Sequence, residues 1–491
     1  MSNKGITPKE ENYSQWYLDI VEGAQLAENS SVRGCMVIKP YGYAIWENIQ
    51  KGLDAMIKES GAKNAYFPIF IPKSFLSKEA SHVKGFAKEC AIVTHHRLRE
   101  TADGKGVEVD PDSKLEEELI VRPTSETIMY DTFSRWITSW RDLPFKINQW
   151  ANIVRWEKRT RPFLRTSEFL WQEGHTVHSN HEEAQKEVLD RLDMYVEFAR
   201  EYLAMETYYG RKSESEKFAG AEDTYGVEAM MQDGKALQFG TSHDLGQNFS
   251  KVFNIQFANK EGVLQYPWQT SWGVSTRMIG ALVMTHSDNK GLVLPPSIAP
   301  VKIVVVPIFK DDNKEKVLQY TKDICKELSK DNIEIELDDR DFASPGVKFN
   351  ESEKKGIPVR IEVGEREMKE GGCVLFRRDT LEKRMISFGD INKEVISTLE
   401  DMQKSMYEKS KKLLISQTHR IEEYEEFKKT FSSDKGFVRA NWCGDPKCEE
   451  SIKYDTKATT RCLTKDGEGK VGKCVYCGKK SNQEWIFANA Y

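Results

Sequence analysis

Apolar residues recur every three or four positions in three segments of the chain, residues 13–31, 43–60 and 181–205. This spacing places the apolar side chains on one side of an α-helix, so it predicts three amphipathic helices. Gly61 follows the second segment as a helix C-cap does, and Asn180 precedes the third as an N-cap does. The apolar side of the third helix consists of Ala184, Val188, Leu192, Tyr195, Val196 and Ala199.

Alternating polar and apolar positions predict an antiparallel hairpin nearer the middle of the chain. Two strand-like runs, Ile153–Trp156 and Leu164–Trp171, flank a strongly basic turn. The side-chain period of two puts a row of charges and one aromatic ring on a common face. A solvated face accounts for this row, and so does a binding site, since guanidinium groups hold phosphate or carboxylate oxygens and a ring stacks on a base. The row comprises Arg155, Glu157, Arg165, Phe169 and Glu173.

The remaining apolar runs predict further elements. Short strands are expected at Met36–Pro40 and Ala65–Ile71, with a polar hairpin loop at 95–118. Residues 301–400 alternate strand and helix, which predicts an α/β layer with a mostly parallel sheet. A long charged helix over residues 392–430 is expected to act as a spacer before the tail.

Length and composition limit the class of protein. At 491 residues the chain is too long for one core, so three or so domains are expected. No apolar run reaches the roughly 20 residues that span a bilayer, and the N-terminus lacks the apolar segment of a secretory signal. We therefore expect a soluble, cytoplasmic protein with no membrane partner. The net charge of −5 argues against a general nucleic-acid coat, and no DNA partner is expected.

Four of the nine cysteines lie together near the C-terminus, as Cys443-x₄-Cys448 and Cys474-x₂-Cys477. Two pairs of thiolates at the ends of a loop match the ligand set of tetrahedral Zn²⁺, and four sulfurs leave no open coordination position. The pattern predicts a structural zinc site, with four free cysteines as the alternative. Cys462 lies between the pairs without a partner.

The triplet Thr124-Ser125-Glu126 precedes a helix predicted from Thr127 to Trp140. In the structural interpretation, Thr124 or Ser125 caps that helix. In the functional interpretation, Thr124 and Glu126 present acceptors to a substrate ammonium group at the end of a strand. The sequence leaves both open.

Two later segments also place polar side chains beside predicted strands. Gln238, Thr241 and His243 belong to a strand that ends in a loop, although a lone histidine is often a hydrogen-bonded core residue. A strand at Ser271–Ser275 leads into an apolar helix with Arg277 in its first turn. A cation there opposes the helix dipole, so it calls for a compensating anion such as a triphosphate.

Three histidines, His175, His178 and His181, are spaced three residues apart before the predicted third helix. A metal site is one explanation of this spacing. Solvated histidines beside a helix cap are the simpler explanation, and we favour it.

Taken together, these motifs resemble the class II aminoacyl-tRNA synthetases. Arg155-x-Glu157 with Arg165-x₃-Phe169 resembles the second signature motif, and the segment through Arg277 resembles the third. PTSE and GTSH resemble the prolyl branch, in its archaeal and eukaryotic-like form with a C-terminal zinc module. The resemblance implies an α+β chain with an antiparallel-sheet catalytic domain (1–296), an α/β anticodon-binding domain (297–400) and a small zinc-binding α/β domain (401–491).

The resemblance also assigns site residues. Arg155 and Arg277 are implied to be catalytic, with ATP and Mg²⁺ as partners of the reaction. The implied ATP contacts are Arg155, Glu157, Arg165, Thr166, Phe169, Gln238, Thr241, Ser275 and Arg277. The implied proline contacts are Thr124, Glu126, Arg155, Trp171, Phe218, His243 and Ser275.

Other features follow from the same resemblance. It implies tRNA(Pro) as a partner and a homodimer. Fewer than 100 residues separate Glu173 from Ser271, so no editing domain is expected between them. A terminal carboxylate at Tyr491 that reaches the active site is a minor hypothesis. Anticodon bases would be read by groups of the kind found at Arg340, Phe342, Lys348 and Arg378.

Three alternatives compete with this assignment. The same fold could charge another amino acid such as threonine, but the catalytic core lacks the His and Cys ligands of a catalytic zinc. A tRNA-binding paralogue without activity would have lost the arginines that this chain retains. A zinc-ribbon regulatory protein would leave the first 300 residues unexplained.

Overall fold

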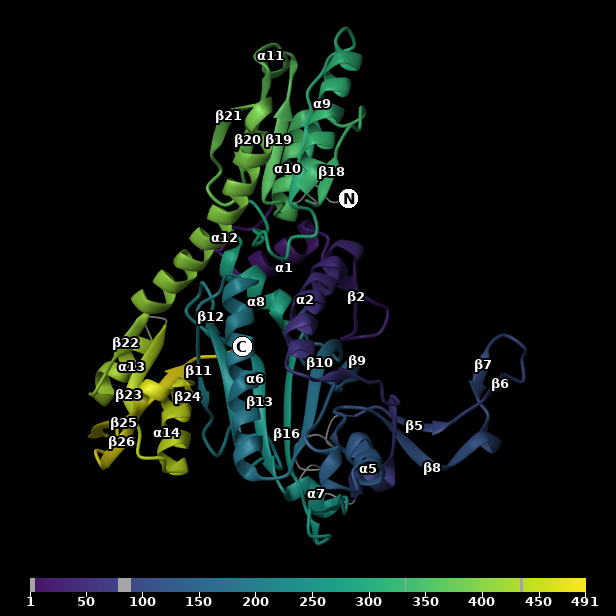
Figure 1. The fold of residues 1–491 in the computed structure, drawn as a ribbon, viewed down its shortest axis with the longest axis vertical. Helices are drawn as coiled ribbons and strands as arrows, with labels where there is room; N and C mark the ends of the chain where they lie inside the picture. Colours follow the sequence, from purple (N-terminus) through teal and green to yellow (C-terminus); the bar gives the residue numbers. More distant parts are fainter. Residues whose placement is uncertain (1–4, 78–89, 332, 433–435) are drawn as a thin grey trace.

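The structure is a computed structural model that describes residues 5–77, 90–331, 333–432 and 436–491. A central body carries a large sheet, and a smaller α/β lobe lies at one end of it (Figure 1). A long helix, α12 (Ile391–Ser416), runs from that lobe along the body to a C-terminal lobe. Among the helices that the structure describes, we find none with the length and hydropathy of a membrane span.

The central sheet has seven strands in the order β11-β12-β13-β16-β10-β9-β3. Its neighbours pair antiparallel, except that β3 runs parallel to β9. The hairpin β9–β10 lies beside β16, so segments more than 90 residues apart are brought to one surface. The strands are β3 (Lys63–Asn64), β9 (Phe145–Val154), β10 (Glu168–His178), β11 (Thr207–Arg211), β12 (Asp223–Met230), β13 (Ala236–Gly246) and β16 (Trp268–Ser275).

Helices cover one face of this sheet and leave room for a site on the other. Tyr195 of α6 donates to the Gln172 side chain at 2.7 Å, so even-numbered positions of β10 face this helix. Trp272 of β16 is buried in the same core. Odd-numbered residues of β10 and β16 therefore face away from α6. The helices in this core are α1 (Tyr13–Gly23), α2 (Pro40–Glu59), α6 (His181–Glu201) and α8 (Arg277–His286).

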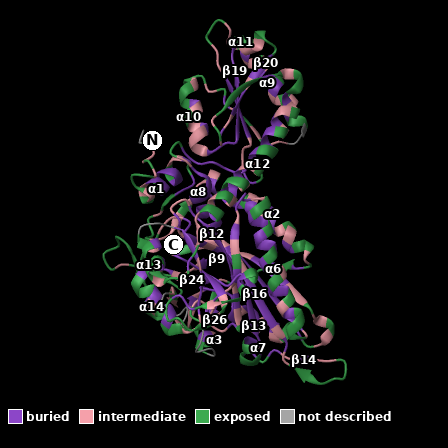
Figure 2. Cartoon of the chain, turned by 90° about the vertical axis from the view of Figure 1, so that its left-hand side faces the viewer, coloured by how far each residue is buried: buried purple, intermediate pink, exposed green. Residues whose placement is uncertain are grey.

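The predicted stripe of α6 is confirmed, since all six of its apolar residues are buried. The strands of the central sheet are mainly buried as well (Figure 2). A second core lies where α5 (Glu126–Trp136) and α7 (Asn248–Val252) pack at the end of the sheet.

An arm of short strands extends from the body beside α5 (Figure 1). Half of the segment 95–118, predicted as a hairpin loop, is in strands, and the loop itself is shorter and joins β6 to β7. β8 pairs with β4 and β5, and β6 pairs with β7 at the tip. These strands are β4 (Phe70–Pro72), β5 (Ile92–His95), β6 (Leu98–Glu100), β7 (Val107–Val109) and β8 (Lys114–Val121). Smaller elements elsewhere in the body are β1 (Ala27–Asn29), β2 (Met36–Ile38), α3 (Lys73–Ser77), β14 (Phe257–Ala258) and β15 (Leu264–Gln265).

The α/β lobe has a five-stranded sheet in the order β18-β17-β19-β20-β21. Its sheet is mixed, because β17 is parallel to both neighbours whereas β20 is antiparallel to both of its own. The expectation of a mostly parallel sheet is therefore met by two of the four strand pairings, those of β17, and not by those of β20. The elements are β17 (Ile303–Pro307), α9 (Lys314–Leu328), β18 (Ile335–Leu337), α10 (Pro345–Lys355), β19 (Val359–Val363), α11 (Glu365–Lys369), β20 (Gly372–Arg377) and β21 (Lys383–Ser387).

The helix predicted at 392–430 is interrupted, because α12 ends at Ser416, strand β22 (Thr418–Arg420) follows, and a second helix, α13, begins at Tyr424. The C-terminal lobe then forms a sheet in the order β22-β23-β26-β24, with β25 paired to β26. Its elements are β22 (Thr418–Arg420), α13 (Tyr424–Ser432), β23 (Phe437–Asn441), α14 (Pro446–Thr456), β24 (Thr459–Cys462), β25 (Glu468–Lys473) and β26 (Lys480–Ala488).

Two N-terminal predictions also differ from the structure. The helix predicted over residues 13–31 ends at Gly23, because Gln25 takes a left-handed conformation with φ of 57°. Of the strand predicted at Ala65–Ile71 only Phe70 and Ile71 lie in a strand, β4, because β3 ends at Asn64 and residues 65–69, which include Pro68, are not in a strand. A proline cannot donate to a strand ladder, which accounts for the break.

Candidate active site

A pocket of about 280 Å³ opens on the face of the central sheet opposite α6. Strands β10, β13 and β16 form its floor, and the start of α5 and the start of α8 border it. Of the residues predicted for the site, eleven line this pocket. They are Thr124, Glu126, Arg155, Phe169, Trp171, Phe218, Gln238, Thr241, His243, Ser275 and Arg277.

Arg155 lies at one side of the pocket, just past the end of β9. Its Nε donates to the carbonyl of Pro123 at 3.0 Å, and its guanidinium carbon is 5.5 Å from the Phe169 ring centroid. Desolvation lowers the pKa of Arg155, against the attraction of nearby carboxylates such as Glu126 and Glu173. The result is a fixed cation beside an aromatic ring at the wall of the pocket.

Arg277 is the first residue of α8 and lies at the other side of the pocket. Its Nε donates to the Leu164 carbonyl and one Nη to the Gln238 carbonyl, both at 3.1 Å. Burial lowers its pKa to about 10, and repulsion from Arg165 and Arg155 adds to the shift. Three cations that repel one another around a pocket favour binding of a polyanion, which would relieve that repulsion.

In the triplet Thr124-Ser125-Glu126 the two hydroxyl groups contact carboxylates and not the helix backbone. Ser125 is the N-cap of α5, yet its side chain makes no cap hydrogen bond. Its hydroxyl instead donates to Glu173 at 2.5 Å, and the Thr124 hydroxyl donates to Glu126. The capping interpretation is therefore wrong. The functional interpretation places acceptor oxygens of Glu126 and Thr124 at the pocket wall.

A buried polar network below these residues includes Glu173, which the sequence placed in the charged row, and His175, which it did not assign to the site. Glu173 accepts from Gln149 at 2.8 Å and from the Trp171 indole at 3.2 Å. His175 lies 3.1 Å from Glu173 and 3.0 Å from the Tyr130 hydroxyl. Strand parity could have found His175 as well, because it continues the pocket-facing positions 169, 171 and 173.

His243 and Phe218 form a less polar wall. Their ring centroids are 4.6 Å apart, and the Thr224 hydroxyl lies 3.0 Å from His243 Nδ1. Burial lowers the pKa of His243 to about 3, and repulsion from His175 acts in the same direction. The imidazole is therefore neutral near pH 7, and it suits a site for a small apolar ring.

Three predicted ATP residues, Glu157, Arg165 and Thr166, do not line the pocket. Glu157 and Arg165 lie outside the strands, because β9 ends at Val154 and β10 begins only at Glu168. The turn between the strands is thus longer than the alternating pattern predicts.

The three histidines of 175–181 do not converge on a metal, and two of them are buried, so the favoured solvated interpretation is wrong as well. His178 lies 2.8 Å from the Thr176 hydroxyl, and burial lowers its pKa to about 4. His181 begins α6 and pairs with Asp244 at 2.7 Å. Asp244 thus has a structural partner.

In the C-terminal lobe the four cysteines predicted to bind metal do converge. The Sγ atoms of Cys443, Cys448, Cys474 and Cys477 lie within 4.8 Å of one another, and Cys443 is 3.7 Å from both Cys448 and Cys477. Ligands about 2.3 Å from a tetrahedral zinc ion are about 3.8 Å apart, so the spacing fits that ion. Cys462 is buried in a different cluster.

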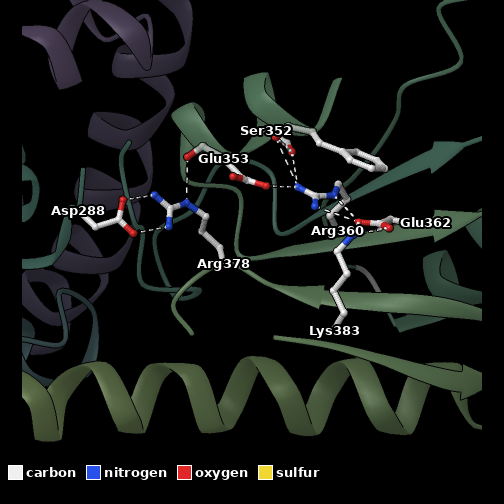
Figure 3. Close-up of polar contacts among 8 residues, drawn as sticks. Asp288, Ser352, Glu353, Arg360, Glu362, Arg378 and Lys383 are labelled. Carbon is white, nitrogen blue, oxygen red and sulfur yellow. Dashed lines mark hydrogen bonds and ion pairs between the residues drawn. The ribbon is translucent and has the colours of Figure 1, made fainter. Parts of the chain in front are cut away.

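Among the candidates for anticodon reading, Arg378 and Lys348 are buried, whereas Phe342 is 82% exposed. Lys348 donates to the Asp338 carbonyl at 2.9 Å. Arg378 is held by an ion pair with Asp288 of the catalytic body (Figure 3). Neither buried cation is free to meet a base, so those two suggestions are wrong. Base-reading side chains must reach splayed nucleotides, and burial prevents this.

The antiparallel sheet carries one pocket, and arginines from the β9–β10 turn and from the start of α8 lie around it. This arrangement defines the class II aminoacyl-tRNA synthetase core. Family models agree with this class. Residues 107–286 match the tRNA synthetase class II core domain for G, H, P, S and T, and residues 302–398 match an anticodon binding domain. Residues 424–491 match the C-terminal domain of prolyl-tRNA synthetase.

Comparison with similar proteins identifies one family within the class II synthetases. A proline–tRNA ligase of Porphyromonas gingivalis is 55% identical over 491 residues, covering 99% of each chain. Proline–tRNA ligases of Bacteroides fragilis and Cytophaga hutchinsonii are 54% and 52% identical, covering 99% and 100% of each chain. This chain belongs to the proline–tRNA ligase family. The family and fold class predicted from its motifs are thereby confirmed.

Proposed function

We propose that the chain activates L-proline with ATP and then transfers it to the 3′ end of tRNA(Pro). The proline carboxylate attacks the α-phosphate, which forms prolyl-adenylate and releases pyrophosphate. A hydroxyl at the tRNA 3′ end then attacks the acyl carbon, and AMP leaves. Full-length similarity to proline–tRNA ligases carries this proposal. Neither step needs a side-chain nucleophile, so catalysis depends on alignment and on stabilisation of phosphoryl charge.

The pocket supplies cations where ATP requires them. We assign Arg155 to the α-phosphate and the proline carboxylate, and Arg277 to the γ-phosphate end. Phe169 would stack on adenine, with Gln238, Thr241 and Ser275 as polar contacts. We keep Glu157, Arg165 and Thr166 in the ATP site as residues of the turn that closes over the nucleotide. Repulsion from Arg165 lowers the pKa of Arg277, which supports a role for the Arg165 charge near the same phosphates. Mg²⁺ would neutralise part of the remaining phosphate charge.

The other half of the pocket suits proline. Thr124 and Glu126 would accept from the secondary ammonium, while Trp171, Phe218 and His243 would enclose the ring. A neutral His243 avoids repulsion with the ammonium group. Such a small pocket discriminates by shape and by the pairing of its buried polar groups.

We predict that proline alone among the twenty amino acids supports ATP–pyrophosphate exchange, measured as labelled ATP formed in the absence of tRNA. Exchange with threonine only, or with no amino acid, would rule out the assignment. Among the described residues, the two groups found with metal-ligand geometry lie outside the pocket. That disfavours a threonyl site, which would use a catalytic zinc.

Several finer points belong to the same proposal. We propose a structural Zn²⁺ in the cysteine cluster, a cytoplasmic location, and domains at 1–296, 297–400 and 401–491. The last boundary falls inside α12, so that helix would connect two domains. No editing domain is expected in this chain.

The chain end lies close to the nucleotide half of the pocket. The Tyr491 hydroxyl donates to Asp233 at 2.6 Å, and its backbone N–H donates to the carbonyl of Ala236, which begins β13. Gln238 follows two residues later on that strand. We retain the proposal that the terminal carboxylate points towards the pocket.

We also propose a homodimer, in which the β5–β8 arm contacts a second copy. Leu98 lies opposite Val109 in the β6–β7 pairing, and Val107 shares their face. All three are more than half exposed. An apolar cluster on a projecting hairpin is typical of an interface.

We therefore predict a dimer by light scattering after gel filtration, and a shift towards monomer when Leu98 and Val109 are both changed to Asp. Charges placed on the apolar face oppose its burial against another chain. The control is Glu108→Gln on the opposite face of the hairpin, which should leave the dimer intact. A wild-type monomer at micromolar concentration would contradict the proposal.

A further inference from the structure

The α/β lobe meets the catalytic body at the loop that follows α8. Asp288 lies two residues beyond the end of α8, and Arg378 lies one residue beyond the end of β20. The two side chains face each other across the junction (Figure 3). Arg378 lies inside the segment that matches the anticodon binding domain, 302–398, whereas Asp288 lies two residues past the end of the class II core match at residue 286.

All three guanidinium nitrogen atoms of Arg378 donate hydrogen bonds at this junction. Its two Nη atoms donate to the two carboxylate oxygens of Asp288 at 2.7 and 2.8 Å, and its Nε donates to the Glu353 carbonyl at 2.9 Å. The Arg378 side chain is fully buried, whereas that of Asp288 is 35% exposed. Burial opposes ionisation of Asp288, yet the Arg378 hydrogen bonds hold the pKa of that carboxyl below its usual value. A bidentate pair of this kind fixes direction as well as distance.

Asp288 also organises the backbone on its own side. Its Oδ1 accepts from the N–H groups of Lys290 and Gly291 at 2.8 and 3.1 Å. Gly291 has a φ of 148°, and a Cβ there would lie 2.5 Å from the Cα of Lys354 in α10. The Leu292 N–H donates to the Lys354 carbonyl at 3.1 Å. The loop after α8 is thus pressed against the end of α10, backbone to backbone.

Arg360, a second buried arginine nearby, provides a contrast. It bonds Glu353 and Glu362, and its guanidinium carbon lies 4.1 and 3.9 Å from the rings of Phe349 and Phe376. All of these partners lie within the α/β lobe (Figure 3). Among the residues that the structure describes, the Arg378–Asp288 pair is the one ion pair between residues 5–300 and residues 302–398.

Helix α8 connects this junction to the pocket. It begins with Arg277 at the nucleotide side and ends just before Asp288. A helix of 10 residues spans about 15 Å and moves as a unit. The orientation of the lobe is therefore fixed relative to the same helix that carries an active-site cation.

We propose that Arg378 is a positioning residue for the tRNA-dependent step, because its clamp on Asp288 holds the anticodon-binding lobe in register with the catalytic pocket. A tRNA that binds both must span a fixed distance and angle between them. If the lobe swings, fewer bound complexes present the 3′ end at the pocket, and productive binding falls with that fraction. Adenylate formation needs only ATP and proline, so it does not depend on the clamp.

The test compares Arg378→Lys with the matched control Arg360→Lys in the full-length protein. Each keeps a positive charge and loses a planar fork in the same lobe. Two rates are measured, proline-dependent pyrophosphate exchange without tRNA and aminoacylation of a tRNA(Pro) transcript over a range of tRNA concentrations. We expect Arg378→Lys to lower aminoacylation kcat/KM for tRNA about tenfold, within the usual range of coupling between sites, while exchange stays within about twofold. Arg360→Lys should not lower aminoacylation relative to exchange.

Asp288→Asn is the second variant, since its acceptor oxygen retains the turn while the charge of the pair is lost. It should show a smaller loss of aminoacylation relative to exchange. If thermal denaturation shows that Arg378→Lys fails to fold, Asp288→Asn takes its place in the test. The proposal is overturned if exchange and aminoacylation fall in proportion in the clamp variants, if neither changes, or if Arg360→Lys gives an equal selective loss.

Discussion

Arg155→Ala is expected to reduce proline-dependent pyrophosphate exchange by about 10³-fold or more, since one fixed donor to a developing charge accounts for roughly 10²- to 10³-fold and Arg155 would contact both reactants. The variant should remain folded. Its guanidinium is partly desolvated and is repelled by Arg277, and both effects lower the stability of the folded protein. Removal of the side chain therefore relieves the desolvation and the repulsion. Glu173 keeps its hydrogen bonds from Ser125 and Gln149.

The measurement pairs exchange kinetics with the melting temperature of the same preparation. Arg159→Ala is the control, because Arg159 is an exposed arginine of the same turn that does not line the pocket. It should leave exchange within about twofold, as surface substitutions do. If Arg155→Ala lost stability in step with its rate, the arginine would be merely structural, and the assignment of the pocket would lose its main support.

The sequence could predict this pocket to the extent that its geometry follows from local pattern. Strand parity aligned Phe169 and Glu173, and the helix beginning near Thr276 placed Arg277 correctly. The parity argument failed for Glu157 and Arg165, because a turn of thirteen residues separates the strands where a shorter one was expected. Alternation is informative only inside a strand, and the pairing of β9 with β10 stops at Val154 and Glu168, so Glu157 and Arg165 lie outside it.

Contacts between distant segments account for the rest of what the sequence did not predict. Ser125 has the sequence position of a helix cap, but the buried Glu173 competes for its hydroxyl. Arg378 has a side chain of the kind that reads bases, but Asp288 from the catalytic body binds its guanidinium group. In both cases local propensity was outweighed by a buried charge that needed a partner. Such partners become visible only when the fold brings them together.

A similar long-range contact joins the C-terminal lobe to the nucleotide side of the core. Arg461 of β24 pairs with Glu228 of β12 at 2.9 Å, and Lys212 contacts the same carboxylate. All three side chains are buried, and Glu228 lies opposite Gln238 across the β12–β13 pairing. Removing one member of a buried ion pair leaves an uncompensated charge, which typically costs about 3–5 kcal/mol. The folding of the tail therefore supports the strand that carries Gln238, the proposed ATP contact.

Removal of zinc is accordingly expected to have the second large effect. Structural Zn²⁺ contributes about 10–16 kcal/mol to the folding of small zinc domains, and this lobe has its own small core around Trp442 and Phe487. Cys474→Ser or prolonged chelation should therefore unfold the lobe and lower the first thermal transition by about 10 °C or more. Exchange activity should fall as well, because unfolding withdraws Arg461 from Glu228 beneath β13. Elemental analysis and calorimetry on one sample measure both quantities.

Cys462→Ala is the matched control for that experiment. Cys462 is a buried cysteine of the same lobe, but it packs with Met230 and Ile486, away from the four converging sulfurs. Its loss should leave one equivalent of zinc bound and cost only the small penalty of a removed sulfur atom in a core. Purified wild-type protein without zinc would reject the site. Zinc loss without a change in exchange would show instead that the strand keeps its place without the lobe, and the coupling through Arg461 would then be excluded.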